Sequence, residues 1–426
     1  MLGTFVQSVV MITDAAFLSR YSTLSFDASG NGGLIYVTLF MGLIGFGDAA
    51  QIIMARRIGQ NKTEQINRII QSAILVILSV ALLFFLFTQT LLSDFILNFS
   101  KSSELALEQI DYLSIRSLGF FFALFMIVLN SFFLSIGKTW IIMIGSAVFA
   151  VSNIILDYLL IFGFGSVEPM GIKGAALASV LSEGIASLTL ITILFRSKER
   201  IKYQIFLRLE IKFEIIKNLL RIGSPLVFQG MIALSSWTLF FIFIEQMGLH
   251  NLTVSQNVRF VYFLAFVPIF GFAATTKTYV AQYMDYTESN IIPKIIKRIQ
   301  LLSFLFLLLI FHGALLYPEK LIQIINPETA YLTDSAFILR IMFGSILIYG
   351  LSSPLFHSIS GSGNTRISLA IETLCTIFYV VYSYLTIKVW GWNITAVWSV
   401  EYLYFSMMGL LSLTYLKFSS WRKKVY

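Results

Sequence analysis

Apolar segments of transmembrane length recur along the whole chain, and short polar segments separate them. A helix of about 20 apolar residues can cross the hydrocarbon core of a bilayer, which is about 30 Å thick. The pattern therefore predicts an all-α polytopic membrane protein with twelve transmembrane helices. The predicted spans are 2–22, 33–55, 69–92, 112–135, 140–164, 175–195, 226–247, 258–282, 301–317, 337–360, 367–389 and 396–416.

The loops between these spans fall into two sets that differ in basic residues. The set on one side, with the C-terminal tail, holds 21 of the 30 basic residues, whereas Arg116 and Arg340 lie at span starts on the other side. Cytoplasmic loops carry an excess of Lys and Arg, so we expect the first side and both termini to be cytoplasmic. The basic residues of the expected cytoplasmic side are Arg56, Arg57, Lys62, Arg68, Lys138, Arg196, Lys198, Arg200, Lys202, Arg208, Lys212, Lys217, Arg221, Lys294, Lys297, Arg298, Arg366, Lys417, Arg422, Lys423 and Lys424.

The longest basic loop, 196–225, lies near the middle of the chain. Its mixture of basic and apolar residues is typical of an amphipathic segment that lies on lipid headgroups. We therefore expect an N-lobe with six spans at 1–195, this cytoplasmic linker, a C-lobe with six spans at 226–416, and a basic cytoplasmic tail at 417–426.

The two predicted lobes share a repeat with one constant offset. Gly45-Phe46 matches Gly271-Phe272, and Gly137-x-Thr139 matches Gly363-x-Thr365 at the same offset. Six spans is an even number, so both lobes enter the membrane from the same side and the repeat is parallel. Repeats of this kind are common in secondary transporters, whose substrate site lies between the halves. A two-lobed channel or scaffold is the alternative.

Composition and charge narrow the class of protein further. Hydrophobic residues make up 57% of the chain and charged residues 12%, whereas soluble domains carry about 25% charged residues. The net charge of +8 lies between the spans, where it suits anionic lipid headgroups rather than nucleic acid. Because Cys375 is the only cysteine, an intrachain disulfide is excluded.

No cleavable signal peptide is expected, because the first apolar stretch carries Asp14 and lacks a basic beginning. Asp14 lies close to the first residue of the sequence, so we expect either a short first span or a start further upstream.

Four polar side chains of the N-lobe are predicted to lie at similar depths in the membrane. Asp14 belongs to span 1, Asn153 and Asp157 share one face of span 5, and Ser179 belongs to span 6. Ionisable residues inside a bilayer cost about 2.5–3.5 kcal/mol each and mark functional sites. Two carboxylates, an amide and a hydroxyl predict a site for a proton or for a metal ion such as Na⁺. Separate, hydrated interfacial carboxylates are the alternative.

Asp48 in span 2 and Lys277 in span 8 form a second candidate. The repeat equates Gln51 with Lys277, so the two charged side chains lie at depths about one helical turn apart. We expect them to pair between the lobes, or else to face separate water-filled vestibules. Weaker candidates within or near the spans are Gln229, Glu183, Glu372 and Glu401.

Motifs of other functions are missing or incomplete. Gly137-Lys138-Thr139 looks like the end of a phosphate-binding loop, but Phe132 stands where that loop needs glycine. The three histidines are scattered without metal-ligand spacing, and no G-x-S-x-G motif occurs. We therefore expect neither an enzyme nor coupling to ATP, and no cofactor besides a coupling ion. An intramembrane enzyme is the alternative of a different class.

Several of these motifs resemble the multidrug and toxic compound extrusion (MATE) family, which belongs to the multidrug/oligosaccharidyl-lipid/polysaccharide flippase superfamily. Asn153-Ile-Ile-Leu-Asp157 is similar to the family's N-x-x-x-D segment. Gly171-Ile-Lys-Gly174-Ala-Ala-Leu-Ala-Ser179 is similar to its G-x-x-G-A-A-x-A-T segment. Asp14 matches the family's aspartate of span 1. Further matches are Arg56-Arg57-Ile58-Gly59 after span 2 and Gly361-Ser-Gly363-Asn364-Thr365 after span 10.

The resemblance covers nearly the whole chain and implies a V-shaped pair of six-helix bundles that work by alternating access. It implies export of amphipathic, often cationic compounds in exchange for H⁺ or Na⁺, with the ion at Asp14, Asn153, Asp157 and Ser179. Many members carry a glutamate in span 7. Here Gln229 is the polar candidate in that place, so the N-lobe site is favoured.

The expected partners are an amphipathic small-molecule substrate and membrane lipids, and neither nucleic acid nor ATP is expected. We expect the protein to be a monomer in the cell inner membrane. Flippases of lipid-linked saccharides share a similar helical plan and are the alternative function. A membrane scaffold without transport activity is a further alternative.

Overall fold

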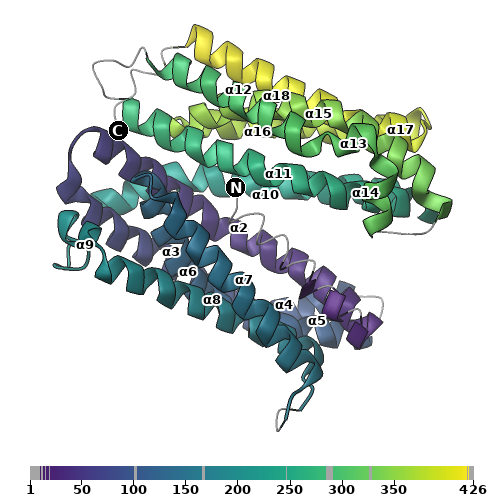
Figure 1. The fold of residues 1–426 in the computed structure, drawn as a ribbon, viewed down its shortest axis with the longest axis horizontal. Helices are drawn as coiled ribbons and strands as arrows, with labels where there is room; N and C mark the ends of the chain where they lie inside the picture. The colour runs from purple at the N-terminus through teal and green to yellow at the C-terminus, as the bar shows by residue number, and fades with distance from the viewer. Residues whose placement is uncertain are drawn as a thin grey trace. The chain divides into compact units, whose positions relative to one another are not determined.

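The computed structural model describes residues 10, 13, 14, 16–18, 20–99, 103–165, 168–245, 247–284, 291–325, 329–419 and 421. All the regular elements in these ranges are helices (Figure 1). The chain divides into two compact units, Leu2–Val227 and Phe228–Tyr426, which are called the N-lobe and the C-lobe below.

The helices of the N-lobe run from purple to teal in Figure 1. They are α2 (Thr23–Gly59), η1 (Thr63–Gln65), α3 (Ile66–Thr90), α4 (Leu92–Phe99), α5 (Ser103–Arg116), α6 (Gly119–Ser135), α7 (Thr139–Phe162), α8 (Gly171–Arg196) and α9 (Lys198–Lys202). Helix α10 (Phe213–Glu245) begins in this lobe and continues into the next.

The C-lobe repeats the pattern of long helices joined by short ones. Its elements after α10 are α11 (Leu249–Tyr283), α12 (Ile292–Phe311), α13 (Gly313–Leu316), α14 (Pro318–Ile325), α15 (Thr329–Gly361), α16 (Thr365–Tyr384), the π-helix η3 (Leu385–Val389), α17 (Ile394–Val397) and α18 (Val400–Phe418).

Helix boundaries in the two lobes follow the constant offset found in the sequence. Helices α2 and α3 begin at Thr23 and Ile66, and α11 and α12 begin at the equivalent positions, Leu249 and Ile292. Helix α6 ends at Ser135, and α15 ends at the position equivalent to it, Gly361. The internal repeat is therefore visible in the elements as well as in the residues.

Membrane-spanning length is met by most of the predicted spans. Within the described residues, nine helices are long and apolar enough to cross a bilayer, or ten if α5 and α6 count as one bent span. Helix α12 covers the predicted span 301–317 up to Phe311 and carries Lys294, Lys297 and Arg298 in its first two turns. More than half of the predicted span 2–22 and most of the predicted tail 417–426 lie outside the described residues.

Two sequence predictions about boundaries were wrong. The span predicted at 112–135 is not one helix, because α5 ends at Arg116 and α6 restarts at Gly119 with a bend of 49°. The linker predicted at 196–225 is not one loop, because α10 begins at Phe213. Leu219 and Ile222 near its start are buried, and this burial stabilises helix where charge suggested a loop.

The glycines of the 171–174 motif permit close contact between α7 and α8. A Cβ atom on Gly174 would lie 2.6 Å from the carbonyl oxygen of Leu160. Gly171 has φ +54°, a left-handed conformation that glycine adopts at little cost. The two helices can therefore pack along each other, which places the polar face of α7 inside the lobe.

The segment 197–212 between α8 and α10, called the linker below, is fixed to α3 by two amide side chains. Asn67 accepts from the backbone N–H of Phe206 at 2.9 Å and donates to the carbonyl of Arg208 at 3.0 Å. Gln71 accepts from the N–H of Glu210 at 2.7 Å and donates to the same Arg208 carbonyl at 2.7 Å. These two side chains therefore hold the linker through its backbone.

We expect the double substitution Asn67→Ala with Gln71→Ala to release this linker. Each lost hydrogen bond costs about 0.5–1.5 kcal/mol, and buried groups left without partners cost more. Trypsin should then cleave the linker at least about tenfold faster than in wild type. Ser79→Ala on α3 removes only a bond to the carbonyl of its own helix and is the matched control. Equal cleavage rates in all three proteins would contradict this role.

Candidate ion-binding site

Helix α7 turns its polar side chains into the N-lobe. Asn153 and Asp157 are both fully buried, whereas Val151, Ile155 and Tyr158 are each more than half exposed. This polarity is the reverse of a soluble helix and is expected where the surroundings are lipid. The spacing of four residues places the amide and the carboxyl on one face, as the sequence predicted.

Asp14 meets Asp157 because its helical segment packs on the end of α7. Leu18 is buried against Ile161, and the ring of Phe17 lies edge-on to the ring of Tyr158 at 6.2 Å. One turn earlier, the carboxyl of Asp14 lies close enough to that of Asp157 for the two to interact. The structure therefore brings together two carboxyl groups that belong to predicted spans 1 and 5.

Several polar side-chain atoms of this group have no hydrogen-bond partner within the part of the chain that the structure describes. Within the described residues, buried atoms without a partner include Oδ1 of Asp14, both carboxyl oxygens of Asp157, and Oδ1 and Nδ2 of Asn153. Buried polar atoms are normally paired, so such a cluster requires an explanation. A proton shared by the carboxyls, or a cation held by their oxygens, would satisfy it, since oxygen ligands suit hard cations.

Ser179, the fourth predicted ligand, lies on the neighbouring helix α8. It is buried on α8, one turn before Glu183. It makes no hydrogen bond to Asn153 or Asp157, whose side-chain atoms lack such partners within the described residues. Its hydroxyl is therefore buried in the N-lobe without a direct bond to the polar groups of α7.

A buried ion pair that the sequence did not reveal lies beside the site. Nη1 and Nη2 of Arg116 donate to Oε2 and Oε1 of Glu183 at 2.9 and 2.6 Å, and both side chains are buried. The guanidinium also lies 3.9 Å from the ring centroid of Tyr36. Arg116 was predicted at a span start, and that prediction was wrong because Arg116 ends α5 and is buried against Glu183.

Gly119 makes room for this ion pair. A Cβ atom at this position would lie 2.3 Å from Nη1 of Arg116 and 2.3 Å from Oε2 of Glu183. A larger residue would therefore displace the pair. The break between α5 and α6 occurs at this same place, so the bend and the ion pair belong together.

The ion pair and the carboxyls of the site lie close enough to interact electrostatically, and both act on Tyr112. It lies in the electrostatic field of Arg116, Asp14, Asp157 and Glu183, and Arg116 also acts on both aspartates. Three ionised carboxylates and one guanidinium give the cluster a formal charge of −2. A buried charge of this size is costly, so the cluster attracts a proton or a small cation.

The C-lobe holds its own buried carboxylate, in a different environment. Glu401 on α18 accepts from the hydroxyls of Tyr262 and Tyr379 at 2.9 Å each, and from Trp237 Nε1 at 3.3 Å. Tyr262 and Tyr36 are equivalent in the repeat, so each lobe has a tyrosine beside a buried glutamate. Neutral donors surround Glu401, whereas Arg116 neutralises Glu183.

We expect Glu401→Gln to destabilise the C-lobe by about 1–3 kcal/mol, because the amide offers an N–H₂ group where three donors already point. The measurement is the free energy of unfolding of the purified protein by denaturant in detergent solution. Glu319→Gln removes an exposed ion pair with Arg340 and is the matched control, with an expected change below about 1 kcal/mol. A variant as stable as wild type would show that the three donors do not require a carboxylate.

The remaining candidates are distributed over both lobes. Glu372 on α16 is buried and accepts a hydrogen bond from Tyr404. Oε1 of Gln229 is buried without a partner within the described residues. Asp48 lies on α2 and Lys277 on α11, in different lobes, so their pairing stays a prediction. The described part of the chain contains no group of three or more His, Cys, Asp or Glu side chains arranged for a metal.

The fold and the site define a class of protein: a helical multi-pass membrane transporter built from two repeated lobes, with carboxylates inside the first. The family model MatE matches residues 1–159 and 225–385. The chain therefore belongs to the MATE family of membrane transporters, as the motifs indicated.

Individual relatives agree with this assignment. The chain is 24% identical over 369 residues to a probable multidrug resistance protein NorM of Thermotoga maritima, covering 84% of this chain and 77% of the relative. A solved multidrug resistance MATE family transporter in an outward-facing conformation matches with TM-score 0.91 at 20% identity, over 100% of this chain and 94% of the other. A transporter of the same superfamily from Pyrococcus furiosus matches with TM-score 0.88 at 18% identity, over 100% and 94%. The solved relatives show that the fold is the twelve-helix MATE fold.

Proposed function

We propose that this protein exports amphipathic, often cationic compounds in exchange for H⁺ or Na⁺, and that the ion binds at Asp14, Asn153 and Asp157. The observation that carries the proposal is the group of buried carboxyl and amide oxygens without partners among the described residues of the N-lobe. Membership of the MATE family and the names of the multidrug resistance relatives support the export of drugs.

The ion acts through the packing of the first helical segment. Without a bound cation, the negative charges of Asp14 and Asp157 repel each other, which disfavours close contact between their helices. A proton or Na⁺ between them removes this repulsion and favours contact. The ion and the exported compound then stabilise different conformations of one two-state element, which is sufficient for coupling.

Neighbouring residues hold the site in place. Asn153 supplies an amide oxygen one turn from Asp157. The charges of the aspartates and of the Arg116–Glu183 pair all act on Tyr112. Ser179 adds a buried hydroxyl from α8 to the polar interior of the lobe. No step in this scheme uses ATP or a cofactor.

The orientation and the environment follow from charge. We propose that both termini and the linker lie in the cytoplasm, because that side holds 21 of the 30 basic residues. The membrane is then the inner membrane of the cell, and the exported compound leaves through the opposite face. A monomer suffices for this scheme, because one chain contains both lobes.

Export of a fluorescent cationic dye from cells that express this protein tests the proposal. The H⁺ gradient and the Na⁺ gradient are collapsed separately, and we expect export to stop with one of them, which identifies the ion. If no dye moves under any gradient, the proposed substrate class is wrong, and movement of lipid-linked saccharides becomes the alternative to measure. If dye moves with both gradients collapsed, the proposed coupling is wrong.

A further inference from the structure

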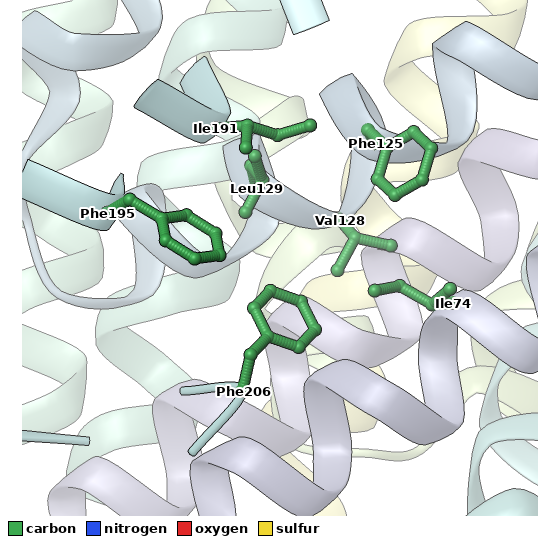
Figure 2. Close-up of a pocket in the computed structure, with 7 residues that line it drawn as sticks. All are labelled: Ile74, Phe125, Val128, Leu129, Ile191, Phe195 and Phe206. Atoms are coloured by element: carbon green, nitrogen blue, oxygen red, sulfur yellow. The ribbon is translucent and has the colours of Figure 1, made fainter. Parts of the chain in front are cut away.

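An apolar pocket of about 210 Å³ opens at the linker end of the N-lobe (Figure 2). Seven apolar side chains line it, and they come from α3, α6, α8 and the linker. They are Ile74, Phe125, Val128, Leu129, Ile191, Phe195 and Phe206. An apolar cavity of about 150 Å³ stays dry and binds benzene, so this pocket is large enough for part of a hydrocarbon chain.

The pocket begins at the end of the transmembrane helices and extends into them. Ile191 lies five residues before the end of α8 at Arg196, and Ile74 lies eight residues after the start of α3 at Ile66. At 1.5 Å per residue, the pocket therefore reaches a depth of about 7–12 Å below the helix ends. Phe195 is 45% exposed, so the pocket opens at the surface of the lobe. Val128 is fully buried and closes its base.

The linker is held in an unfavourable conformation that closes one end of the pocket. Phe206 has φ +56° and Gln204 has φ +53°, values that cost a non-glycine residue about 1–2 kcal/mol each. The bond from the N–H of Phe206 to Asn67 holds this conformation, and the ring stacks against Phe195 at 6.3 Å. Figure 2 shows Phe206 and Phe195 together at the pocket. Backbone strain of this kind is a reason to look for a function.

Positive charge accompanies the apolar lining. The guanidinium of Arg200 lies 4.3 Å from the ring centroid of Phe195, and its Nε is buried without a hydrogen-bond partner within the described residues. Arg196 follows Phe195 directly. The linker also exposes Ile201 and Leu209 by 73% and 86%, which suits a segment in contact with the lipid surface.

We propose that this pocket binds part of one acyl chain of an anionic phospholipid, with its phosphate at Arg200 and Arg196. The apolar lining accepts the chain, the guanidinium groups attract the phosphate, and the depth matches a chain that descends from the headgroup region. The bound lipid fills the space beneath the linker and so connects the linker to the surrounding membrane. This site is separate from the carboxylates of the N-lobe and does not depend on the exported compound.

Lipid titration of the full-length protein, followed by native mass spectrometry, tests this site. Dioleoyl phosphatidylglycerol and dioleoyl phosphatidylcholine are the two probes. For wild type we expect one phosphatidylglycerol to bind at least about tenfold more tightly than phosphatidylcholine, because the guanidinium of Arg200 lies over the Phe195 ring that lines the pocket. Equal binding of the two lipids would overturn the headgroup assignment.

Substitutions separate the pocket from the general lipid surface. Ile191→Trp fills the pocket and should weaken the tight phosphatidylglycerol at least about tenfold, since several methylene contacts are lost. Ile74→Trp fills it from another helix and should do the same, should the first variant fold poorly. Leu188→Trp, on the exposed face of α8, is the matched control. Unchanged lipid affinity in both filled variants would overturn the proposal.

Charge is tested in the same way. Arg200→Gln should reduce the preference for phosphatidylglycerol about fivefold. Lys217→Gln, which removes an exposed charge of α10, should leave the preference unchanged. Equal effects of the two substitutions would mean that only diffuse charge acts, and would overturn the assignment of the phosphate to Arg200.

A photoactivatable phosphatidylglycerol with a diazirine on its acyl chain tests the wild-type protein directly. We expect cross-links to concentrate in peptides that contain 125–129 and 206. Cross-links spread evenly over all exposed helix surfaces would overturn the proposal. Displacement of the lipid by the exported dye, at the concentrations that support export, would assign the pocket to the dye and overturn the lipid assignment.

Discussion

Asp157→Asn is expected to abolish ion-driven dye export while the protein still reaches the membrane. Asparagine keeps the size of the side chain but removes its charge and its ability to take up a proton. Asp157 is fully buried on α7, and both of its carboxyl oxygens lack hydrogen-bond partners within the described residues. Without this carboxylate, the cluster cannot change its affinity for an ion between conformations, and coupling is lost.

The expected magnitude follows from coupling free energies. Coupling between two sites is typically about 1–3 kcal/mol, which corresponds to a change of about 5–150-fold. We therefore expect Asp157→Asn and Asp14→Asn each to reduce gradient-driven export at least about tenfold. The measurement is the initial rate of dye efflux, normalised to the amount of protein in the membrane.

A matched control uses another aspartate of the same lobe. Asp111 on α5 is partly exposed and pairs with Lys173 at 3.1 Å. Because an exposed ion pair contributes about 0–1 kcal/mol, Asp111→Asn should leave export within about twofold of wild type. If Asp157→Asn exported as well as Asp111→Asn, the coupling ion would bind elsewhere, and Asp48 with Lys277 would be the next residues to test.

Breaking the ion pair of Arg116 and Glu183 should cost much of the stability of the N-lobe. Removing one partner leaves the other as an uncompensated buried charge, which costs about 3–5 kcal/mol. Arg116→Met should therefore lower the free energy of unfolding by about this amount, and so should Glu183→Gln, which leaves the guanidinium without a counter-charge. Thermal and denaturant unfolding of the purified protein in detergent measure it.

The double substitution distinguishes a paired charge from general damage to the core. When both partners become apolar, neither charge is stranded, and such replacements are frequently neutral or stabilising. We therefore expect Arg116→Met with Glu183→Leu to be less destabilised, by at least about 2 kcal/mol, than the sum of Arg116→Met and Glu183→Leu measured singly. Additive losses would show that the two side chains do not depend on each other.

Local sequence patterns were sufficient to predict the parts of the site that lie on one helix. Asn153 and Asp157 share a face because four residues make about one helical turn, and the sequence alone shows this spacing. The repeat between the lobes also required only the sequence, and the helix boundaries agree with it. The family assignment followed from motifs of the same local kind.

Features that depend on contacts between distant segments could not be predicted. Arg116 and Glu183 are far apart in the sequence, and they meet beside a break where the chain bends by 49°. No hydropathy pattern encodes that bend, so a basic residue at a span start was assigned to the outer loops. Glu401 was a weak candidate for the same reason, because its three donors come from α10, α11 and α16.

The placement of the linker shows the same limit. Its basic charge indicated a segment on the lipid surface, but could not show that Asn67 and Gln71 hold residues 206–210 on α3 through backbone hydrogen bonds. Amide side chains at the start of a predicted span are not recognisable as partners of a segment so distant in the sequence. The aromatic wall that Phe206 gives the pocket depends on this contact.

Counterflow in proteoliposomes is the most direct test of the proposed antiport. Purified wild type and Asp157→Asn are reconstituted with a dye gradient and no initial H⁺ or Na⁺ gradient. Because coupling is reciprocal, the dye gradient should drive H⁺ or Na⁺ in the opposite direction in wild type and not in Asp157→Asn. Dye flux without any opposed ion flux in wild type, or equal ion flux in the variant, would contradict an antiport coupled through the N-lobe carboxylates.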